Sequence, residues 1–156
     1  MSLPNQLIIR AANLDDVESI ITFSAAMALE TENRQLDLAR LREGTLSLLN
    51  TPSYGFFMVA EIRDGEQRRL IGQLMITYEW SDWRNGEWWW IQSVYVPPQH
   101  RRGGVLRALY AHVHAEAVGQ PHGEVEPDRV QGMVAIELMS GRIEAILARA
   151  NAEIEG

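Results

Sequence analysis

The sequence predicts an α/β (α+β) domain in which a mostly antiparallel central sheet is flanked by helices. Short β-rich segments and helical patterns follow one another in the order strand, two helices, three strands, helix. Two dipeptides that are typical of tight turns, Asp64-Gly65 and Asn85-Gly86, separate the three consecutive strands. The length of 156 residues fits one domain, which we expect to span residues 1–156.

The composition excludes several classes of protein. Hydrophobic residues make up 46% and charged residues 22% of the chain, which is close to the averages of soluble globular domains and argues against disorder. The net charge of 14 − 21 = −7 disfavours nucleic acid or an anionic membrane as a partner. The absence of cysteine excludes disulfides, thiolate metal sites and a Cys nucleophile, and it suits a reducing cytoplasm, the location that we expect. No apolar run reaches the ~20 residues of a membrane span, and we expect no secretory signal.

The N-terminal part is expected to form one strand and two helices. Residues 6–11 (QLIIRA) are β-rich. Asn13 precedes an acidic first turn and apolar residues at helical spacing, which predicts a capped helix over 14–30. The same spacing predicts a second helix over 37–49, which ends at Thr51-Pro52.

Three strands and a helix follow. We expect the strands over 55–62, 70–78 and 88–96, and a polar loop with aromatic residues over 80–86. Pro97-Pro98 ends the last strand, and apolar spacing predicts a helix over 102–118. Beyond a loop over 119–127, residues 132–138 form either a strand or a helix, and residues 143–154 have a helical pattern.

The segment 94–110 (VYVPPQHRRGGVLRALY) carries the chemistry. A strand ends, a turn follows with Arg101-Arg102-Gly103-Gly104, and a helix starts at once. The first N–H groups of a helix lack partners and lie in positive potential, and glycines allow an anion to approach the backbone. Arginine, to which all 14 basic residues of the chain belong, adds forked donors for phosphate or carboxylate. The segment indicates an anion site; the alternative is a loop with solvated arginines and with glycines for turn geometry.

This segment resembles the acetyl-CoA signature of the GNAT N-acetyltransferases, in which a strand ending in Val and Pro precedes Arg/Gln-x-x-Gly-x-Gly/Ala at a helix start. Arg101 matches the first basic position and Gly104 the first glycine, whereas Leu106 departs from the final Gly/Ala. The resemblance covers roughly residues 6–118 and implies acetyl-CoA as the co-substrate of an acyltransferase-like domain. In the family, backbone N–H groups of this loop hold the pyrophosphate. The corresponding residues here are Arg102, Gly103, Gly104, Val105 and Leu106, and the strand residues beside the pantetheine and the acetyl group are Val94, Tyr95 and Val96.

The resemblance implies transfer of an acetyl group to a primary amine of a small-molecule or amino-acid-like acceptor by direct attack. The amine needs a base, because an ammonium group has no lone pair. Glu79 and Glu87 are our first candidates for this base, and Gln92 or Ser93 could orient a water. Each acid could instead be a solvated loop charge.

The acceptor site is expected near the connection of the first two helices, which borders it in the family. Glu30 and Glu32 lie there and could bind a cationic amine, or they could be a solvated helix end. Trp80 is a candidate for lining the cleft, with core packing as its alternative. The tryptophans at 88–90 alternate between the faces of their strand, so Trp89 faces away from the other two. No cluster has metal-ligand spacing, and we expect no metal.

The resemblance fails after residue 118. The family continues with a strand, Asn-x-x-Ala, a Tyr on a helix and two more strands, but here no Asn precedes Ala145 at the right offset and no Tyr follows Tyr110. The C-terminal part is atypical and truncated relative to the family. It has diverged or been lost, or a partner chain completes the sheet in a homodimer, or the protein binds acetyl-CoA without efficient catalysis. Two functions stay open: an N-acetyltransferase, and a catalytically degenerate acetyl-CoA-binding module with a sensory or structural role.

Overall fold

The computed structural model describes residues 6–83 and 85–118, with Trp88 and Val118 described by their backbone alone. The elements in these ranges are β1 (Leu7–Ala11), the 3-10 turn η1 (Leu14–Asp16), α1 (Val17–Glu32), α2 (Leu38–Asn50), β2 (Gly55–Asp64), β3 (Gln67–Ser81), β4 (Gly86–Tyr95), the 3-10 turn η2 (Pro98–His100) and α3 (Val105–Val118). Their order confirms the predicted fold class. The elements predicted over 119–154 lie outside the described residues.

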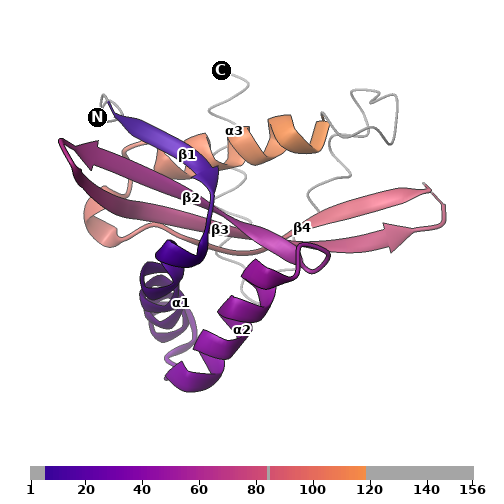
Figure 1. Cartoon of the computed structure of the whole chain (residues 1–156), viewed down its shortest axis with the longest axis horizontal. Helices are drawn as coiled ribbons and strands as arrows, with labels where there is room; N and C mark the ends of the chain where they lie inside the picture. Colours follow the sequence, from indigo (N-terminus) through magenta and orange to yellow (C-terminus); the bar gives the residue numbers. More distant parts are fainter. Residues whose placement is uncertain (1–5, 84, 119–156) are drawn as a thin grey trace.

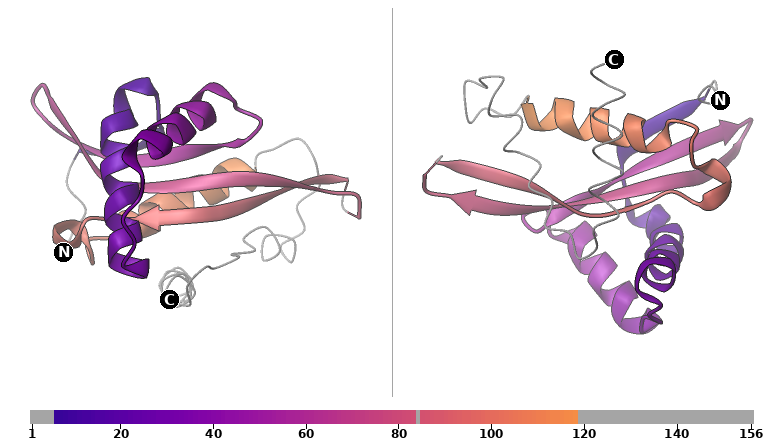
Figure 2. Two further views of the ribbon diagram at one scale, coloured as in Figure 1. Left: turned by 90° about the horizontal axis from the view of Figure 1, so that it is seen from below. Right: turned by 180° about the vertical axis from the view of Figure 1, so that it is seen from behind.

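The four strands form one antiparallel sheet in the order β1-β2-β3-β4. Figure 1 shows α1 and α2 on one face of this sheet and α3 on the other, and Figure 2 shows the same arrangement from below and from behind. β1 and β4 are the two edge strands of the described sheet, and β4 leads into the turn before α3. β4 pairs with β3 alone. One side of its backbone therefore has no partner among the described strands.

Side-chain caps begin the 3-10 turn η1, which leads into α1, and the helix α2. Asn13 accepts a hydrogen bond from the Asp15 N–H at 2.9 Å, and Asp16 accepts one from the Asn13 N–H at 2.8 Å, which confirms the predicted cap. The first turn is 3-10, so the α-helix begins only at Val17. Asp37 caps α2 by accepting from the N–H groups of residues 39 and 40. None of the helices among the described residues has the length and apolar character needed to cross a membrane.

The polar loop expected over 80–86 is shorter than predicted, because β3 runs to Ser81 and β4 begins at Gly86. Trp89 packs edge-on against Phe56, with ring centroids 5.3 Å apart, and lies 5.6 Å from Tyr78. These contacts extend the pairing of β3 and β4, so the hairpin projects beyond the helices (Figure 1).

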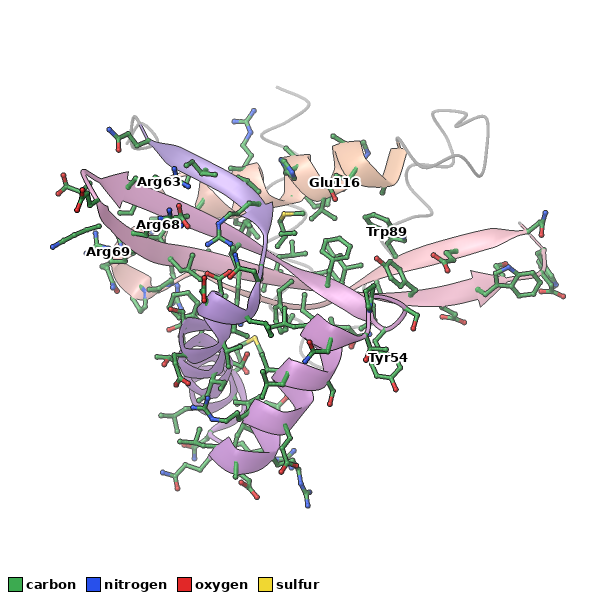
Figure 3. All side chains as sticks on the ribbon, in the orientation of Figure 1. Tyr54, Arg63, Arg68, Arg69, Trp89 and Glu116 are labelled. Carbon is green, nitrogen blue, oxygen red and sulfur yellow. The ribbon has the colours of Figure 1, made fainter. Side chains whose placement is uncertain are left out.

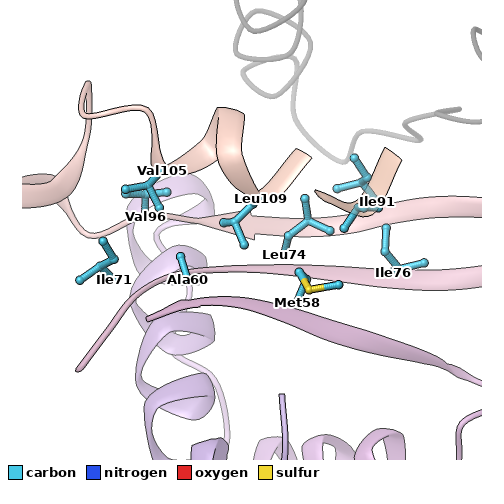
Figure 4. Close-up of a cluster of buried hydrophobic side chains, with 10 residues drawn as sticks. Met58, Ala60, Ile71, Leu74, Ile76, Ile91, Val96, Val105 and Leu109 are labelled. Atoms are coloured by element: carbon cyan, nitrogen blue, oxygen red, sulfur yellow. The ribbon is translucent and has the colours of Figure 1, made fainter. Parts of the chain in front are cut away.

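The larger hydrophobic core lies between the sheet and α3 (Figure 4). Its buried members are Met58, Ala60, Ile71, Leu74, Ile76, Ile91, Val96, Val105, Leu109 and Val113. α3 lies directly on the backbone of β3: a Cβ atom added to Gly72 would be 2.9 Å from Cγ1 of Val105. A smaller cluster of Ile20, Leu48 and Phe57 anchors α1 and α2 to the opposite face. The start of α3 is therefore fixed to the sheet by close packing.

Candidate functional site

The turn between β4 and α3 has a backbone that differs from the predicted helix start. Arg102 has a φ of 63° and Gly104 a φ of 82°, so residues 102–104 form a turn and the α-helix begins at Val105. The carbonyl of Gly104 accepts from the Ala108 N–H at 3.0 Å, which begins the helical hydrogen-bond ladder. Glycine adopts the left-handed region without strain, whereas Arg102 occupies it at a cost of about 1 kcal/mol.

The geometry of this turn fits a phosphate group. An α-helix leaves its first N–H groups without partners inside the helix, and here these belong to Val105, Leu106 and Arg107. The helix dipole adds positive potential at the same end. Gly103 and Gly104 have no side chains to keep an anion away from the backbone. The residues therefore suit the pyrophosphate of the co-substrate that the signature implies.

Leu106, which stands where the signature has Gly or Ala, packs with the hydrophobic core under α3. Val105 beside it is buried in the same core. The larger side chain is thus accommodated by the core, and the turn keeps its two glycines.

The side chain of Arg101, which we expected to serve an anion together with Arg102, is paired within the protein. Its two terminal nitrogens donate to the Glu30 carboxylate at 2.6 and 2.7 Å, and its Nε donates to the Val96 carbonyl at 2.8 Å. Its guanidinium also lies 5.7 Å from the ring centre of Tyr95. The Glu30 carboxylate accordingly raises the pKa of Arg101. Arg102, in contrast, is exposed.

The three strand residues expected beside the thioester lie at the C-terminal end of β4. Tyr95 pairs with Gln73 of β3, and its ring lies 5.5 Å from that of Phe23 on α1. Val94 is half-buried against the α3 core, and Val96 is buried and leaves the strand toward the turn. These residues form the short path from the edge of the sheet to the turn. The strand expected to follow α3 lies outside the described residues.

The two predicted bases lie on the projecting hairpin, on opposite faces. Glu79 pairs with Trp88 and Glu87 with Trp80, and directly paired residues share a face. Val94 pairs with Leu74, five residues before Glu79, so at about 3.3 Å per residue Glu79 lies roughly 17 Å along the strand from Val94. A group held beside Val94 is beyond direct reach of either carboxylate. Ser93, which is buried, and Gln92, which is exposed at a bulge in β4, are much closer to it.

The predicted acceptor residues do not form one group. Glu30 and Glu32 are both exposed in the last turn of α1. Trp80 is 63% exposed on the hairpin, on the face that Tyr78 and Trp89 share with the α3 core. It therefore lies on the other face of the sheet from α1, which corrects its grouping with the two acids. Trp89 packs against the α3 core, whereas Trp90, the next residue along β4, pairs with Thr77 and takes the other face of the strand.

A buried charge cluster near the turn was missed by sequence reasoning. Arg10 donates to both oxygens of Asp16 at 2.7 and 2.9 Å and to Glu61 at 2.7 Å, and Arg63 donates to Glu61 at 2.7 Å. Burial alone would raise the pKa of Asp16, but hydrogen bonds from Arg10 and the Asn13 N–H lower it. The hydrogen bond from Arg63 lowers the pKa of Glu61 in spite of burial. A charged residue inside the apolar strand GFFMVAEI was the available signal.

A cavity of about 650 Å³ separates this cluster from the turn. Arg10, Asp16 and Glu61 line it on one side, and Gln99 and His100 line it on the other. Burial, with a contribution from Arg69, lowers the pKa of His100. Figure 3 shows Arg63, Arg68 and Arg69 together at this end of the sheet, away from Trp89. Among residues 6–83 and 85–118, no three His, Asp or Glu side chains are grouped to hold a metal.

Solved structures with the same fold include several acetyltransferases. A possible acetyltransferase from Clostridium difficile 630 is 30% identical, with 96% of this chain and 90% of that chain covered and a TM-score of 0.78. An aminoglycoside acetyltransferase from an uncultured soil metagenomic sample, in complex with sisomicin, is 16% identical over 95% and 87% of the chains, with a TM-score of 0.66. A predicted acetyltransferase from Clostridium acetobutylicum, solved with acetyl-CoA, is 13% identical over 85% and 81%, with a TM-score of 0.61. At these lower identities the likeness shows the fold alone.

The sequence comparison agrees with the structural one. No curated protein matches the chain at a significant level. The sequence profile described as the Acetyltransferase (GNAT) family matches residues 17–126, which is more than half of the chain and includes the turn at the start of α3. The chain therefore belongs to the GNAT acetyltransferase family.

Proposed function

We propose that residues 1–156 are one domain that transfers the acetyl group of acetyl-CoA to a primary amine of a small-molecule or amino-acid-like acceptor. The observation that carries this proposal is the turn over 101–106, where two glycines precede the free N–H groups of α3. Family membership supports acetyl transfer in general.

In this proposal the chain supplies binding and orientation. The N–H groups of Arg102, Gly103, Gly104, Val105 and Leu106 hold the pyrophosphate, and the edge of β4 at Val94, Tyr95 and Val96 holds the pantetheine arm. The acceptor amine attacks the thioester carbonyl carbon of acetyl-CoA directly, so that a C–N bond forms, the C–S bond breaks and the CoA thiolate leaves. The chain must keep that amine neutral, because an ammonium group cannot attack.

The proton of the amine needs an acceptor near Val94. With the acetyl group beside Val94–Val96, neither Glu79 nor Glu87 can take this proton directly. A sequence motif supports the placement of acetyl-CoA, whereas no motif supports the choice of Glu79 or Glu87 as the base. We therefore do not assign the direct uptake of this proton to either carboxylate. We propose instead a water held by Gln92 or Ser93.

The acceptor is proposed to bind on the α1 side of β4. The carboxylates of Glu30 and Glu32 attract a cationic amine there, although that of Glu30 also binds Arg101. The similar fold of an aminoglycoside acetyltransferase in complex with sisomicin supports a small-molecule acceptor. A cytoplasmic location and a homodimer remain predictions; a monomer mass by light scattering at micromolar concentration would exclude the homodimer.

A catalytically degenerate acetyl-CoA-binding module is the second candidate. The distance of both predicted bases from Val94 favours it. Release of free thiol from acetyl-CoA in the presence of amines separates the two functions. The screen uses polyamines, aminoglycosides and amino-acid amides, with the Gly104→Glu variant as the control for background hydrolysis. Amine-dependent release that Gly104→Glu abolishes supports the enzyme; acetyl-CoA binding without release by any amine supports the module.

A further inference from the structure

The side chain of Arg101 joins three parts of the molecule. It belongs to the cofactor turn, it donates to Glu30 in the last turn of α1, and it donates to the Val96 carbonyl at the end of β4. Arg101 and Glu30 are 71 positions apart in the sequence, and the bond between them is bidentate. Their side chains are 40% and 38% exposed, so neither is free of solvent.

These contacts use the donors that a phosphate ligand would need. Both terminal nitrogens of the guanidinium point at one carboxylate, and the Nε–H is held by a main-chain carbonyl. The ring of Tyr95 lies beside the same guanidinium, 5.7 Å from its central carbon. A guanidinium group that contacts a carboxylate, a main-chain carbonyl and an aromatic ring has a fixed position, and this also fixes the backbone of Arg101.

We propose that Arg101 is a positioning residue, which with Glu30 braces the cofactor turn against α1 and β4 and does not itself bind the phosphate. The brace keeps residues 102–104 in the conformation that presents the N–H groups of α3. It also makes cofactor affinity depend on an acidic residue of the acceptor-side helix. This inference rests on the proposed function, because it assumes that acetyl-CoA binds at the turn.

For the Glu30→Gln variant, the positioning role of Arg101 and a phosphate-binding role predict changes in acetyl-CoA affinity of opposite sign. If Arg101 were a phosphate ligand, removing the negative charge of Glu30 would release it and strengthen cofactor binding. If Arg101 is a brace, Glu30→Gln weakens binding, because the turn loses its fixed support. The sign of the Glu30→Gln effect thus separates the two roles.

The experiment is a double-mutant cycle on acetyl-CoA affinity, measured by calorimetric titration of the full chain well below its unfolding temperature. We expect Arg101→Gln and Glu30→Gln each to weaken acetyl-CoA binding about five- to tenfold. The double variant should be no weaker than the weaker single variant, within about twofold, because both changes remove the same brace. The matched control is the bidentate pair of Arg42 and Glu18, which joins α2 to the first turn of α1, whereas Glu30 lies in the last turn. Arg42→Gln and Glu18→Gln should leave the affinity unchanged.

Three results would overturn the brace. Unchanged or tighter binding by Glu30→Gln would assign Arg101 directly to the phosphate or to no role. Additive losses in the double variant would mean that the two residues act separately. A lower unfolding temperature with unchanged affinity would mean that the pair is merely structural.

Hydrogen exchange of the free protein separates failure of the brace from failure of the proposed function. Without any ligand, Arg101→Gln and Glu30→Gln should both speed the exchange of backbone amides over 99–104, and Arg42→Gln should not. If the unmodified protein does not bind acetyl-CoA, the proposed function fails, and faster exchange in both variants would still support the brace. Unchanged exchange would contradict it.

Discussion

The two ends of β4 differ: the sequence predicted functional residues at both ends, but the structure brings them close together at only one end. At the C-terminal end, Tyr95, Arg101 and the start of α3 lie against α1 and the core, within a few residues of one another. At the N-terminal end, Glu79 and Glu87 lie on opposite faces of a projecting hairpin. The first set came from a motif with fixed spacing, and the second came from nearness in sequence to a strand. A motif predicts local backbone geometry, whereas nearness to a strand does not predict which face a side chain takes.

The largest effect is expected from the charge cluster of Arg10, Asp16, Glu61 and Arg63, which lies across the cavity from Gln99 and His100. Glu61 is 1% exposed and binds both Arg10 and Arg63, so Glu61→Gln should lower the free energy of unfolding by about 3 kcal/mol at pH 7. The pKa of Glu61 is lowered from 4.5 in the folded protein, so its stabilisation is present above pH 4.5 and is lost as pH falls through the folded pKa.

Urea unfolding between pH 7 and pH 3 measures this effect. The free energy of unfolding of the unmodified protein should fall steeply below pH 4.5. That of Glu61→Gln should be lower already at pH 7 and should fall less over the same pH interval. Glu18→Gln, which breaks the exposed pair with Arg42, is the control and should resemble the unmodified protein. Parallel curves for the unmodified protein and Glu61→Gln would show that the cluster does not control acid stability.

The next effect tests whether the start of α3 depends on close packing. A Cβ atom at Gly72 would be 2.9 Å from Cγ1 of Val105 and 3.3 Å from Cδ1 of Leu109, so in Gly72→Ala these α3 side chains must shift. We expect a loss of about 1–3 kcal/mol in unfolding free energy and about tenfold weaker acetyl-CoA binding. Gly44→Ala in α2, where no atom lies within 4 Å, should instead stabilise the protein by about 0.5–1 kcal/mol. Normal acetyl-CoA affinity in Gly72→Ala would mean that the turn does not depend on the seating of α3.

The smallest effect is expected at the hairpin. Since neither carboxylate reaches a group beside Val94, Glu79→Gln and Glu87→Gln should each change kcat/KM by less than about threefold once an acceptor amine is known. Ser93→Ala, a change much closer to Val94, should lower kcat about tenfold or more. A hundredfold loss in either glutamate variant would restore that residue as the base and move the acetyl group toward the hairpin.

The sequence predicted correctly those features of the fold that depend on a few neighbouring residues. The Asn13 cap, the opposite facing of Trp89 and Trp90 and the start of a turn at the RRGG segment all follow from spacing along one element. The strands reach further into 80–86 than predicted, because Trp80 pairs with Glu87 and Ser81 with Gly86 although this stretch is polar. The bond between Arg101 and Glu30 joins residues 71 positions apart and has no local pattern at all. The sequence thus indicated an anion site but not the partner of its first arginine.

The central claim is that acetyl-CoA binds through the turn over 101–106, and calorimetric titration tests it most directly. The unmodified protein should bind acetyl-CoA with micromolar affinity. Gly104→Glu places a carboxylate where the phosphate is expected and a side chain at a φ of 82°, and it should abolish binding. Gly44→Glu in α2 is the matched control, because it adds the same charge at an exposed glycine whose Cβ would meet nothing within 4 Å, and it should bind normally. Absence of binding by the unmodified protein, or normal binding by Gly104→Glu, would contradict the account.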